Sequence, residues 1–233
     1  MLIPFNKEVI FVNMRRFLFC LIFLFVFSCS KEEKVVSDIF KNYDGKYVIL
    51  ISKKRFALEV YERDKGVVAC FKVGYGSNPD MGPKLYEGDN RTPSGLYEVN
   101  EILSMDADKF SPSYQKLKSM NEHFFSKAQG YTKFGKSYED LGDNAYGPRY
   151  FGINYPNEED KKRYDKALNL GQIPIVNGKV ASIGYGIAIH GNNDEASIGH
   201  LCSSGCIRMY NSDVVKLDKY ISLGTPVIIL QDN

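Results

Sequence analysis

Two stretches of the sequence decide the fold and the chemistry of this chain, Ile187-Ala188-Ile189-His190-Gly191 and Ser203-Ser204-Gly205-Cys206-Ile207-Arg208-Met209. The first places a histidine at the end of a short apolar run, and the second places a cysteine sixteen positions after that histidine. A thiol is a weak nucleophile until it becomes a thiolate, and a nearby imidazole is the usual group that activates it. The two stretches therefore predict a cysteine nucleophile, Cys206, with His190 as its base.

The glycine before the cysteine supports the same interpretation. Because it has no Cβ atom, Gly205 lets a substrate approach the backbone closely. The amides of Gly205 and Cys206 can then donate to the oxygen that becomes negatively charged during acyl transfer. This part of the sequence therefore predicts an acyl-transfer site.

Three other interpretations of these residues are open from the sequence. A cysteine is commonly a small buried apolar residue, and a single histidine is commonly a core residue with its hydrogen bonds satisfied. Zinc is the second interpretation, because His190, His200, Cys202 and Cys206 are all ligand types. Their spacing lacks the short pairs of common zinc sites, so we expect no metal. The third interpretation is a disulfide between Cys202 and Cys206.

The sequence resembles the YkuD-type L,D-transpeptidases in four motifs, which occur in the family's order and span residues 46–231. They are His190-Gly191 with Ser203-x-Gly205-Cys206-Ile207-Arg208-Met209, GDNRTPSGLY at 88–97, YPNEED at 155–160 and GTPVII at 224–229. The YPNEED segment resembles the murein-modifying members. Ser204 departs from the pattern, since many members carry His or Arg there. We expect this departure to affect contacts to an acceptor rather than the nucleophile.

The resemblance implies a mixed-strand β-sandwich or barrel of the L,D-transpeptidase type, mostly β, with peripheral helices and a long insertion. It also implies that peptidoglycan stem peptides are the substrate and that no cofactor takes part. In that scheme Cys206 forms a thioester with the stem-peptide donor, and an amine acceptor then receives the acyl group. Two alternatives stay open. Water as the acceptor gives an L,D-carboxypeptidase or endopeptidase, and an inactive site gives a cell-wall-binding lipoprotein.

The resemblance also implies roles for the residues around the nucleophile. The amides of Gly205 and Cys206 form the oxyanion hole, and the Gly191 carbonyl orients the imidazole. Arg208 is a candidate to bind a substrate carboxylate, with a structural ion pair as the equal alternative. Ser203 and Ser204 are placed at the substrate, and we expect Ser203 to shape the turn rather than to react.

The N-terminus has the features of an export signal. Two arginines precede an apolar run at residues 17–27, which is too short to span a bilayer comfortably. The sequence Ser28-Cys29-Ser30 and the polar residues after it resemble a bacterial lipoprotein cleavage site with Cys29 lipidated. We therefore expect a lipoprotein signal at 1–29 and a periplasmic, membrane-anchored protein. A plain cleaved signal and an uncleaved anchor are the alternatives.

The mature chain then comprises a polar tether at 30–45 and one catalytic domain at 46–233, which is long enough to bury a core. The net charge of +2 and the absence of a basic block argue against nucleic acid as a partner. Cys20 would leave with the signal, so three thiols remain besides Cys29, and an odd number implies at least one free thiol. The resemblance assigns the free thiol to Cys206 and leaves pairing of Cys70 with Cys202 undecided.

Apolar runs and alternation predict the strands of the domain, at 47–51, 56–61, 67–73, 95–99, 187–189 and 227–230. Residues 53–55 are expected to form an exposed hairpin connection. Helices are expected at 109–127, at 158–170 after an Asn157 cap, and from a cap at 211–213 to Tyr220. The last helix is expected to bury Val214, Val215, Leu217 and Ile221. The Thr92-Pro93-Ser94-Gly95 turn is either structural or part of the substrate wall.

Residues 104–182 have poor periodicity, and we expect an insertion that forms a wall or lid beside Cys206 rather than a separate domain. Its aromatic side chains are expected to pack on the sheet and line a groove for the peptide. They include Tyr131, Phe134, Tyr138, Tyr146, Tyr150 and Tyr155. A mobile surface insertion is the alternative.

Overall fold

The computed structural model describes residues 32–80, 82–122 and 125–231, and the chain divides into two compact units, 1–44 and 45–233. In the first unit, residues 32–40 are helical, inside the segment expected to be a polar tether. The predictions on residues 1–29, including Cys29, lie outside the described residues. Within the described residues, no helix has the length and apolar composition needed to cross a bilayer.

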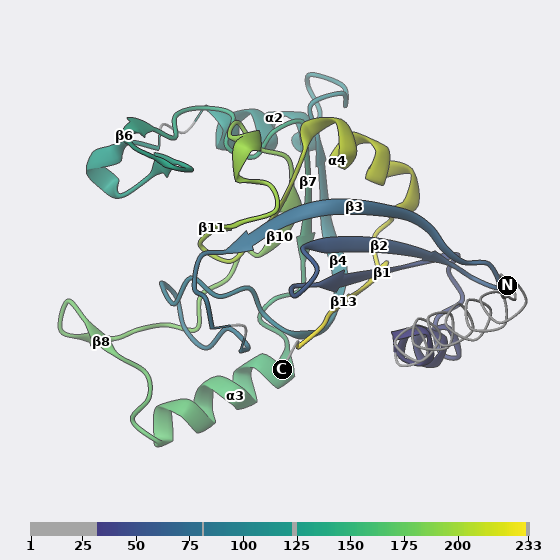
Figure 1. The fold of residues 1–233 in the computed structure, drawn as a ribbon, viewed down its shortest axis with the longest axis horizontal. Helices are drawn as coiled ribbons and strands as arrows, with labels where there is room; N and C mark the ends of the chain where they lie inside the picture. The colour runs from purple at the N-terminus through teal and green to yellow at the C-terminus, as the bar shows by residue number, and fades with distance from the viewer. Residues whose placement is uncertain (1–31, 81, 123–124, 232–233) are drawn as a thin grey trace, which may run out of the picture. The chain divides into compact units, whose positions relative to one another are not determined.

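A nine-stranded mixed sheet dominates the described part of the second unit (Figure 1). Its order is β11 (Leu201–Ser203), β3 (Gly66–Gly76), β12 (Ile207–Met209), β10 (Ala188–His190), β7 (Arg149–Ile153), β4 (Gly95–Ser104), β13 (Pro226–Ile229), β1 (Tyr47–Ser52) and β2 (Ala57–Glu62). β2 also pairs with β3, so the sheet closes on itself. The prediction of a mostly β, mixed-strand barrel or sandwich is confirmed, and so are the predicted strands.

The interior of this barrel explains why most strands could be predicted. Apolar side chains from opposite strands form one core, among them Ile49 and Ile51 on β1 and Ile207 and Met209 on β12. Each of these side chains is fully buried. Burying such side chains stabilises the fold by about 1.5–3 kcal/mol apiece. The core therefore holds β10 and β12, the two strands of the predicted active site, in a rigid frame.

β7 was not predicted, and it corrects the expected role of residues 104–182. It pairs with β4 on one side and β10 on the other, at the centre of the sheet. All five of its residues are buried, so they show no apolar–polar alternation that would identify a strand. This part of the segment thus belongs to the sheet and not to a lid.

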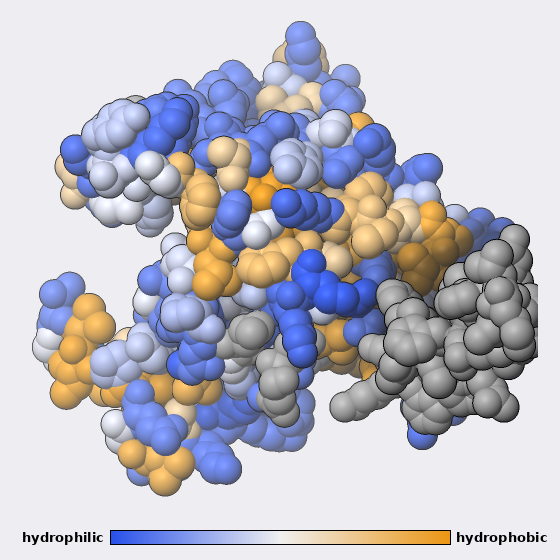
Figure 2. All heavy atoms as spheres, viewed as in Figure 1, coloured by the Kyte–Doolittle hydropathy of each residue, from blue (hydrophilic) through white to orange (hydrophobic). Residues whose placement is uncertain are grey.

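The rest of that segment surrounds the sheet. α2 (Pro112–Asn121) packs on β4 and is shorter than predicted, because Ser111 caps it and Pro112 starts it. The other elements are η1 (Lys127–Gln129), β5 (Thr132–Lys133), β6 (Lys136–Asp140), α3 (Glu158–Asn169), β8 (Ile175–Val176) and β9 (Lys179–Val180). α3 begins at the predicted Asn157 cap. Apolar side chains are exposed on the β8–β9 hairpin, at the lower left of Figure 2.

The last helix differs from its prediction in two respects. It begins at Asn211 rather than after it, as α4 (Asn211–Leu217) followed by η3 (Asp218–Tyr220). The Asn211 side chain does not cap the helix but bonds both the amide and the carbonyl of Asn192. The predicted burial of Val214 and Leu217 is confirmed, whereas Val215 is exposed because it points away from the sheet. A short helix after β12 therefore fixes the loop that follows His190.

Candidate active site

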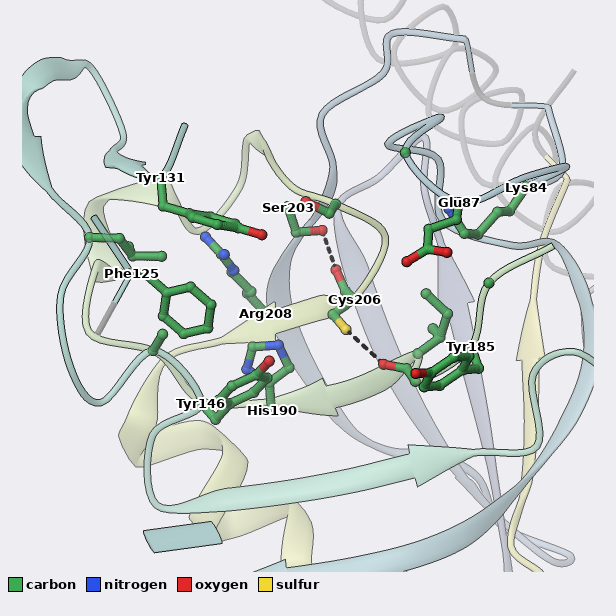
Figure 3. A pocket seen from close by; sticks show the side chains of 17 residues that line it. Lys84, Glu87, Phe125, Tyr131, Tyr146, Tyr185, His190, Ser203, Cys206 and Arg208 are labelled. Atoms are coloured by element: carbon green, nitrogen blue, oxygen red, sulfur yellow. Dashed lines mark hydrogen bonds between the residues drawn. The ribbon is translucent and has the colours of Figure 1, made fainter. Parts of the chain in front are cut away.

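Two neighbouring parallel strands bring His190 and Cys206 together. In the register of β10 and β12, His190 lies opposite Arg208, and Cys206 comes directly before β12. Side chains two residues apart on a strand share a face, so Cys206, Arg208 and His190 all point to the same side of the sheet. They line one cavity of about 330 Å³ together with Ser203 and Ser204 (Figure 3). The predicted pair is thus brought into one cavity.

The thiol of Cys206 is protonated at rest. Burial raises the pKa of Cys206, although a hydrogen bond from the Ala188 amide and the charges of Arg208 and Lys84 act in the opposite direction. Its Sγ donates a hydrogen bond of 3.5 Å to the carbonyl of Gly186. The sulfur therefore needs a base to become nucleophilic at neutral pH.

His190 lies in the same cavity as this thiol, with its imidazole uncharged. Burial lowers the pKa of His190 to about 3, and the positive charge of Arg208 adds to this effect. Its Nδ1 lies 2.5 Å from the Gly191 carbonyl, which can only accept, so Nδ1 carries the proton. Nε2 is then an unprotonated acceptor. The rings of Tyr146 and Tyr150 pack on the imidazole at centroid distances of 5.0 and 6.2 Å.

The turn before the nucleophile is held by Ser203. Its hydroxyl donates to the Cys206 carbonyl at 2.6 Å and accepts from the Gly205 amide at 3.1 Å. Ser203 therefore shapes the turn, as expected. Of the two amides predicted to form an oxyanion hole, that of Gly205 is therefore already engaged by this hydroxyl.

Only glycine fits at position 205. Its φ is +142°, and a Cβ atom there would lie 2.8 Å from Cδ1 of Ile187 and 2.9 Å from the carbonyl oxygen of Arg91. The first clash is with a side chain that can move, but the second is with backbone. Gly205 is thus required by geometry, for a reason different from the close substrate approach expected from the sequence.

Thr92 holds the same turn through its hydroxyl. Of the two roles considered for the Thr-Pro motif, a structural turn and a substrate wall, the structural one is seen. Its Oγ1 donates to the Gly205 carbonyl at 2.7 Å and accepts from the Gly76 amide at 2.9 Å. Lys53 donates to Ser94 Oγ at 2.6 Å and is only 1% exposed. The prediction that residue 53 is part of an exposed connection is wrong, because its ammonium binds the motif inside the protein.

Arg208 carries a charge without a carboxylate partner. Its Nη1 donates to the Cys202 carbonyl at 3.1 Å, and its buried Nε has no hydrogen-bond partner. In the described ranges no carboxylate lies within salt-bridge distance of this guanidinium, unlike Arg149, which pairs with Asp106 and Asp218. The alternative of a structural ion pair for Arg208 is therefore not seen here.

A second cavity of about 380 Å³ shares part of its lining with the first cavity. Ser203, Ser204 and Arg208 line both cavities. Of the predicted wall residues, Tyr131 lines both and Phe134 only the second. Tyr146 lines the first cavity, Tyr150 and Tyr155 are buried, and Tyr138 is 74% exposed and lines neither.

The wall is tied to the loop after His190. The Phe134 amide donates to Asp194 Oδ2 at 2.6 Å, and the Phe134 ring stacks on His200 with centroids 4.5 Å apart. These contacts place the β5–β6 hairpin over the second cavity. Since Lys133 and Phe134 line that cavity, part of the expected wall is seen.

The alternative interpretations of the cysteines can now be compared with the structure. Cys70, Cys202 and Cys206 are all free thiols, so neither disulfide considered from the sequence forms. Cys70 is exposed rather than a buried thiol. Within the described ranges, no three His, Cys, Asp or Glu side chains are grouped as metal ligands, so the zinc set containing His190 and His200 does not assemble.

Sequence reasoning missed two charged residues of the first cavity, Lys84 and Glu87. Lys84 is 4% exposed and pairs with the buried Asp89 at 2.6 Å. Asp89 also accepts from three backbone amides of its loop, those of Leu85, Tyr86 and Arg91. The Gly88-Asp89 pair of the family motif was the available signal, because a buried aspartate after glycine orders its own loop.

The chain is similar to a known protein family over most of its length. A family model described as the L,D-transpeptidase catalytic domain, YkuD, matches residues 46–229. YqjB of Bacillus subtilis (strain 168), which carries an L,D-transpeptidase name, is 53% identical over 49 residues, or 21% of this chain and 27% of YqjB. YkuD of the same organism is 53% identical over 45 residues, or 19% of this chain and 26% of YkuD.

Solved structures are similar over most of the chain. Bd1075 of Bdellovibrio bacteriovorus is 25% identical with a TM-score of 0.46, over 80% of this chain and 48% of that chain. The helical cell shape determining protein Pgp2 from Campylobacter jejuni is 24% identical with a TM-score of 0.47, over 81% of this chain and 48% of that chain. The chain thus spans about half the length of these two proteins, and its matches span about a quarter of the Bacillus relatives.

Proposed function

The chain belongs to the YkuD family of L,D-transpeptidase catalytic domains, and on that premise we propose that it exchanges the terminal residue of peptidoglycan stem peptides through a thioester on Cys206. The reaction has two halves, acylation of the thiol by a donor and transfer to an amine. The neutral thiol and the neutral imidazole described above define how the first half begins.

In the first half, Cys206 attacks the carbonyl carbon of the stem residue at position three. Its proton passes to Nε2 of His190, and the carbonyl oxygen becomes an oxyanion that the Cys206 amide stabilises. The carbon–nitrogen bond then breaks. D-alanine leaves as a neutral amine after taking the proton from His190, and the acyl group remains on sulfur as a thioester.

In the second half, the amine of a neighbouring stem or protein attacks the thioester. His190 takes a proton from that amine, and the new amide bond forms as the carbon–sulfur bond breaks. The thiolate then regains its proton from His190, which restores the resting site. The lowered pKa of His190 keeps the imidazole neutral at the start of each half, and it also makes Nε2 a weaker base.

The observation that carries the proposal is that a second cavity adjoins the one that contains Cys206. A transferase needs room for a donor and for an acceptor at one sulfur, whereas hydrolysis needs room for one peptide and water. Both cavities are lined by Ser203, Ser204 and Arg208. We assign the first cavity, which contains Cys206 and His190, to the donor and the second to the acceptor amine.

Arg208 and Ser204 have distinct roles in this assignment. The guanidinium of Arg208 has no carboxylate partner in the described part of the chain, so it can hold the carboxylate of the departing D-alanine with two hydrogen bonds. Ser204 is exposed at the entrance to both cavities. It contacts the acceptor, where a larger His or Arg would restrict the opening.

We also propose that the protein is exported and acts in the periplasm, held to the membrane by a lipid on Cys29. The support is the apolar run at 17–27 and the Ser28-Cys29-Ser30 sequence that follows it. A substrate in the cell wall requires the site to lie outside the cytoplasm.

The test is mass spectrometry of purified muropeptides after incubation with the full chain and a D-amino acid or stem-peptide amine. Transfer predicts 3-3 crosslinks or exchanged terminal residues, and Cys206→Ala should form none. Cys70→Ala is the matched control, since Cys70 is exposed on β3 and lines neither cavity, and it should retain most of the activity. Trimmed tripeptides without any exchange would instead identify water as the acceptor and overturn the transferase proposal.

A further inference from the structure

Glu87 is an acidic residue of the donor cavity that neither the sequence motifs nor the proposed chemistry uses. It lines the same cavity as Cys206, and in Figure 3 it lies on the opposite side of the sulfur from Arg208. The cavity therefore has a negative side and a positive side, with the nucleophile between them. A ligand with charges of both signs fits such an arrangement.

The loop holds Glu87 in a defined position. Its amide donates to the Ser182 carbonyl at 2.7 Å, and Ser182 Oγ donates to its Oε2 at 2.6 Å. Gly184 packs directly on it, since a Cβ atom at 184 would lie 3.1 Å from Cβ of Glu87. The carboxylate is therefore preorganised, and its second oxygen, Oε1, has no partner among the described residues.

Glu87 also lacks the partner that its sequence position suggests. Glutamates elsewhere in the described chain pair with a lysine three residues away, for example Glu62 with Lys65 and Glu159 with Lys162. Lys84 lies three residues before Glu87, but its ammonium turns inward and pairs with Asp89 at 2.6 Å. Lys84, Asp89 and Glu87 together carry one net negative charge, because Lys84 neutralises Asp89. The remaining charge is that of Glu87, which faces the cavity.

We propose that Glu87 binds the side-chain ammonium of a diamino acid at position three of the donor stem. This inference rests on the proposed function, which places the carbonyl of that residue at Cys206. The leaving D-alanine carboxylate then extends toward Arg208, and the side chain of the reacting residue extends to the other side, toward Glu87. An ammonium donating to Oε1 forms a charge-assisted hydrogen bond, which is stronger than one between neutral groups. The donor cavity thereby selects stems that keep this amine free.

Tyr185 lies on the Glu87 side of the cavity (Figure 3). Tyr185 lines the cavity there although it is 86% exposed, and it lies between Gly184 and Gly186, both with positive φ. Its ring can cover the methylene groups of the diamino side chain while the ammonium reaches Glu87. The donor cavity thus selects a side chain of methylene groups that ends in an amine, and not a neutral or acidic side chain.

The experiment compares two donors and three proteins, all as full chains. The donors are a stem tetrapeptide with the free side-chain amine and the same peptide with that amine acetylated. The proteins are the wild type, Glu87→Gln and, as the matched control, Glu159→Gln on α3. Glutamine keeps an oxygen that can accept from Ser182 but carries no charge. D-alanine release gives kcat/KM for each pair, and a carbapenem without a cationic group reports on Cys206 itself.

We expect the wild type and Glu159→Gln to prefer the free amine by about two- to fivefold, because Glu87 is exposed and water weakens an exposed ion pair. Glu87→Gln should remove that preference, while the carbapenem, which has no cationic group, still acylates Cys206. A wild-type enzyme without the preference, or a Glu87→Gln enzyme that keeps it, would overturn the inference. Carbapenem acylation without D-alanine release from either donor would instead overturn the proposed function, and the inference with it.

Discussion

Thr92→Val tests whether the Thr-Pro motif positions the nucleophile. Thr92 is 2% exposed, and its hydroxyl joins the Gly205 carbonyl to the Gly76 amide. Valine has nearly the same shape, so the substitution creates no cavity but leaves a buried donor and a buried acceptor without partners. Each unsatisfied group costs about 1–3 kcal/mol. Since losses above about 4 kcal/mol are exceptional for single substitutions, we expect a destabilisation of about 2–4 kcal/mol.

The loss of stability alone does not identify a positioning role. For a domain of this size, it corresponds to a fall in melting temperature of about 4–16 °C. The specific readout is the rate at which a carbapenem acylates Cys206, measured by intact mass well below the melting temperature of the variant. Releasing the Gly205 carbonyl lets the turn move, and a misplaced nucleophile slows acylation on the order of ten- to a hundredfold.

Thr225→Val is the matched control. Thr225 is 1% exposed, and its Oγ1 accepts from the Ser222 amide at 2.9 Å, at the start of β13 and away from both cavities. We expect it to lower the melting temperature and to leave acylation within about twofold of the wild type, because it does not touch the Gly205 turn. Equal acylation rates in the Thr92 and Thr225 variants would refute the positioning role.

Four further predictions concern the pH dependence of acylation, the pH dependence of stability, the wall and export. Because the pKa of His190 is lowered to about 3, acylation of the wild type by a carbapenem should persist at pH 5. Arg208→Gln removes a positive charge near the imidazole, so it should move the acid limb of the acylation pH profile to higher pH. A wild-type acid limb near pH 6.5 would contradict this. The unfolded state takes up a proton at His190 below pH 6.5 and the folded state does not, so stability should fall by about 1.4 kcal/mol for each pH unit from 6.5 toward 3, measured by urea unfolding. Replacing residues 127–140 with a short Gly-Ser linker should slow transfer to an amine more than acylation, because the hairpin lines the acceptor cavity; equal effects on both steps would argue against a wall at that site. Cys29→Ala should move the protein from the membrane to the soluble periplasmic fraction, whereas retention with the signal still attached would show an uncleaved anchor.

The sequence alone was sufficient where the evidence is local. Apolar runs and alternation identify strands such as β1 and β2, and the Asn157 cap identifies the start of α3, because each depends on neighbouring residues only. The Cys206–His190 pair could be predicted in the same way, since few residue types activate a thiol. The family motifs then indicated that the two segments lie side by side, as the pairing of β10 with β12 shows.

Tertiary structure decided the features that depend on distant partners. β7 shows no periodicity because both its faces are buried by segments far away in sequence. Lys53 looks like a surface residue until Ser94 and Thr92 surround its ammonium. Glu87 has no lysine partner at the cavity because Lys84, three residues before it, pairs with the buried Asp89 instead. Burial and pairing of a charged side chain are set by what the whole fold brings around it, and local sequence does not contain that information.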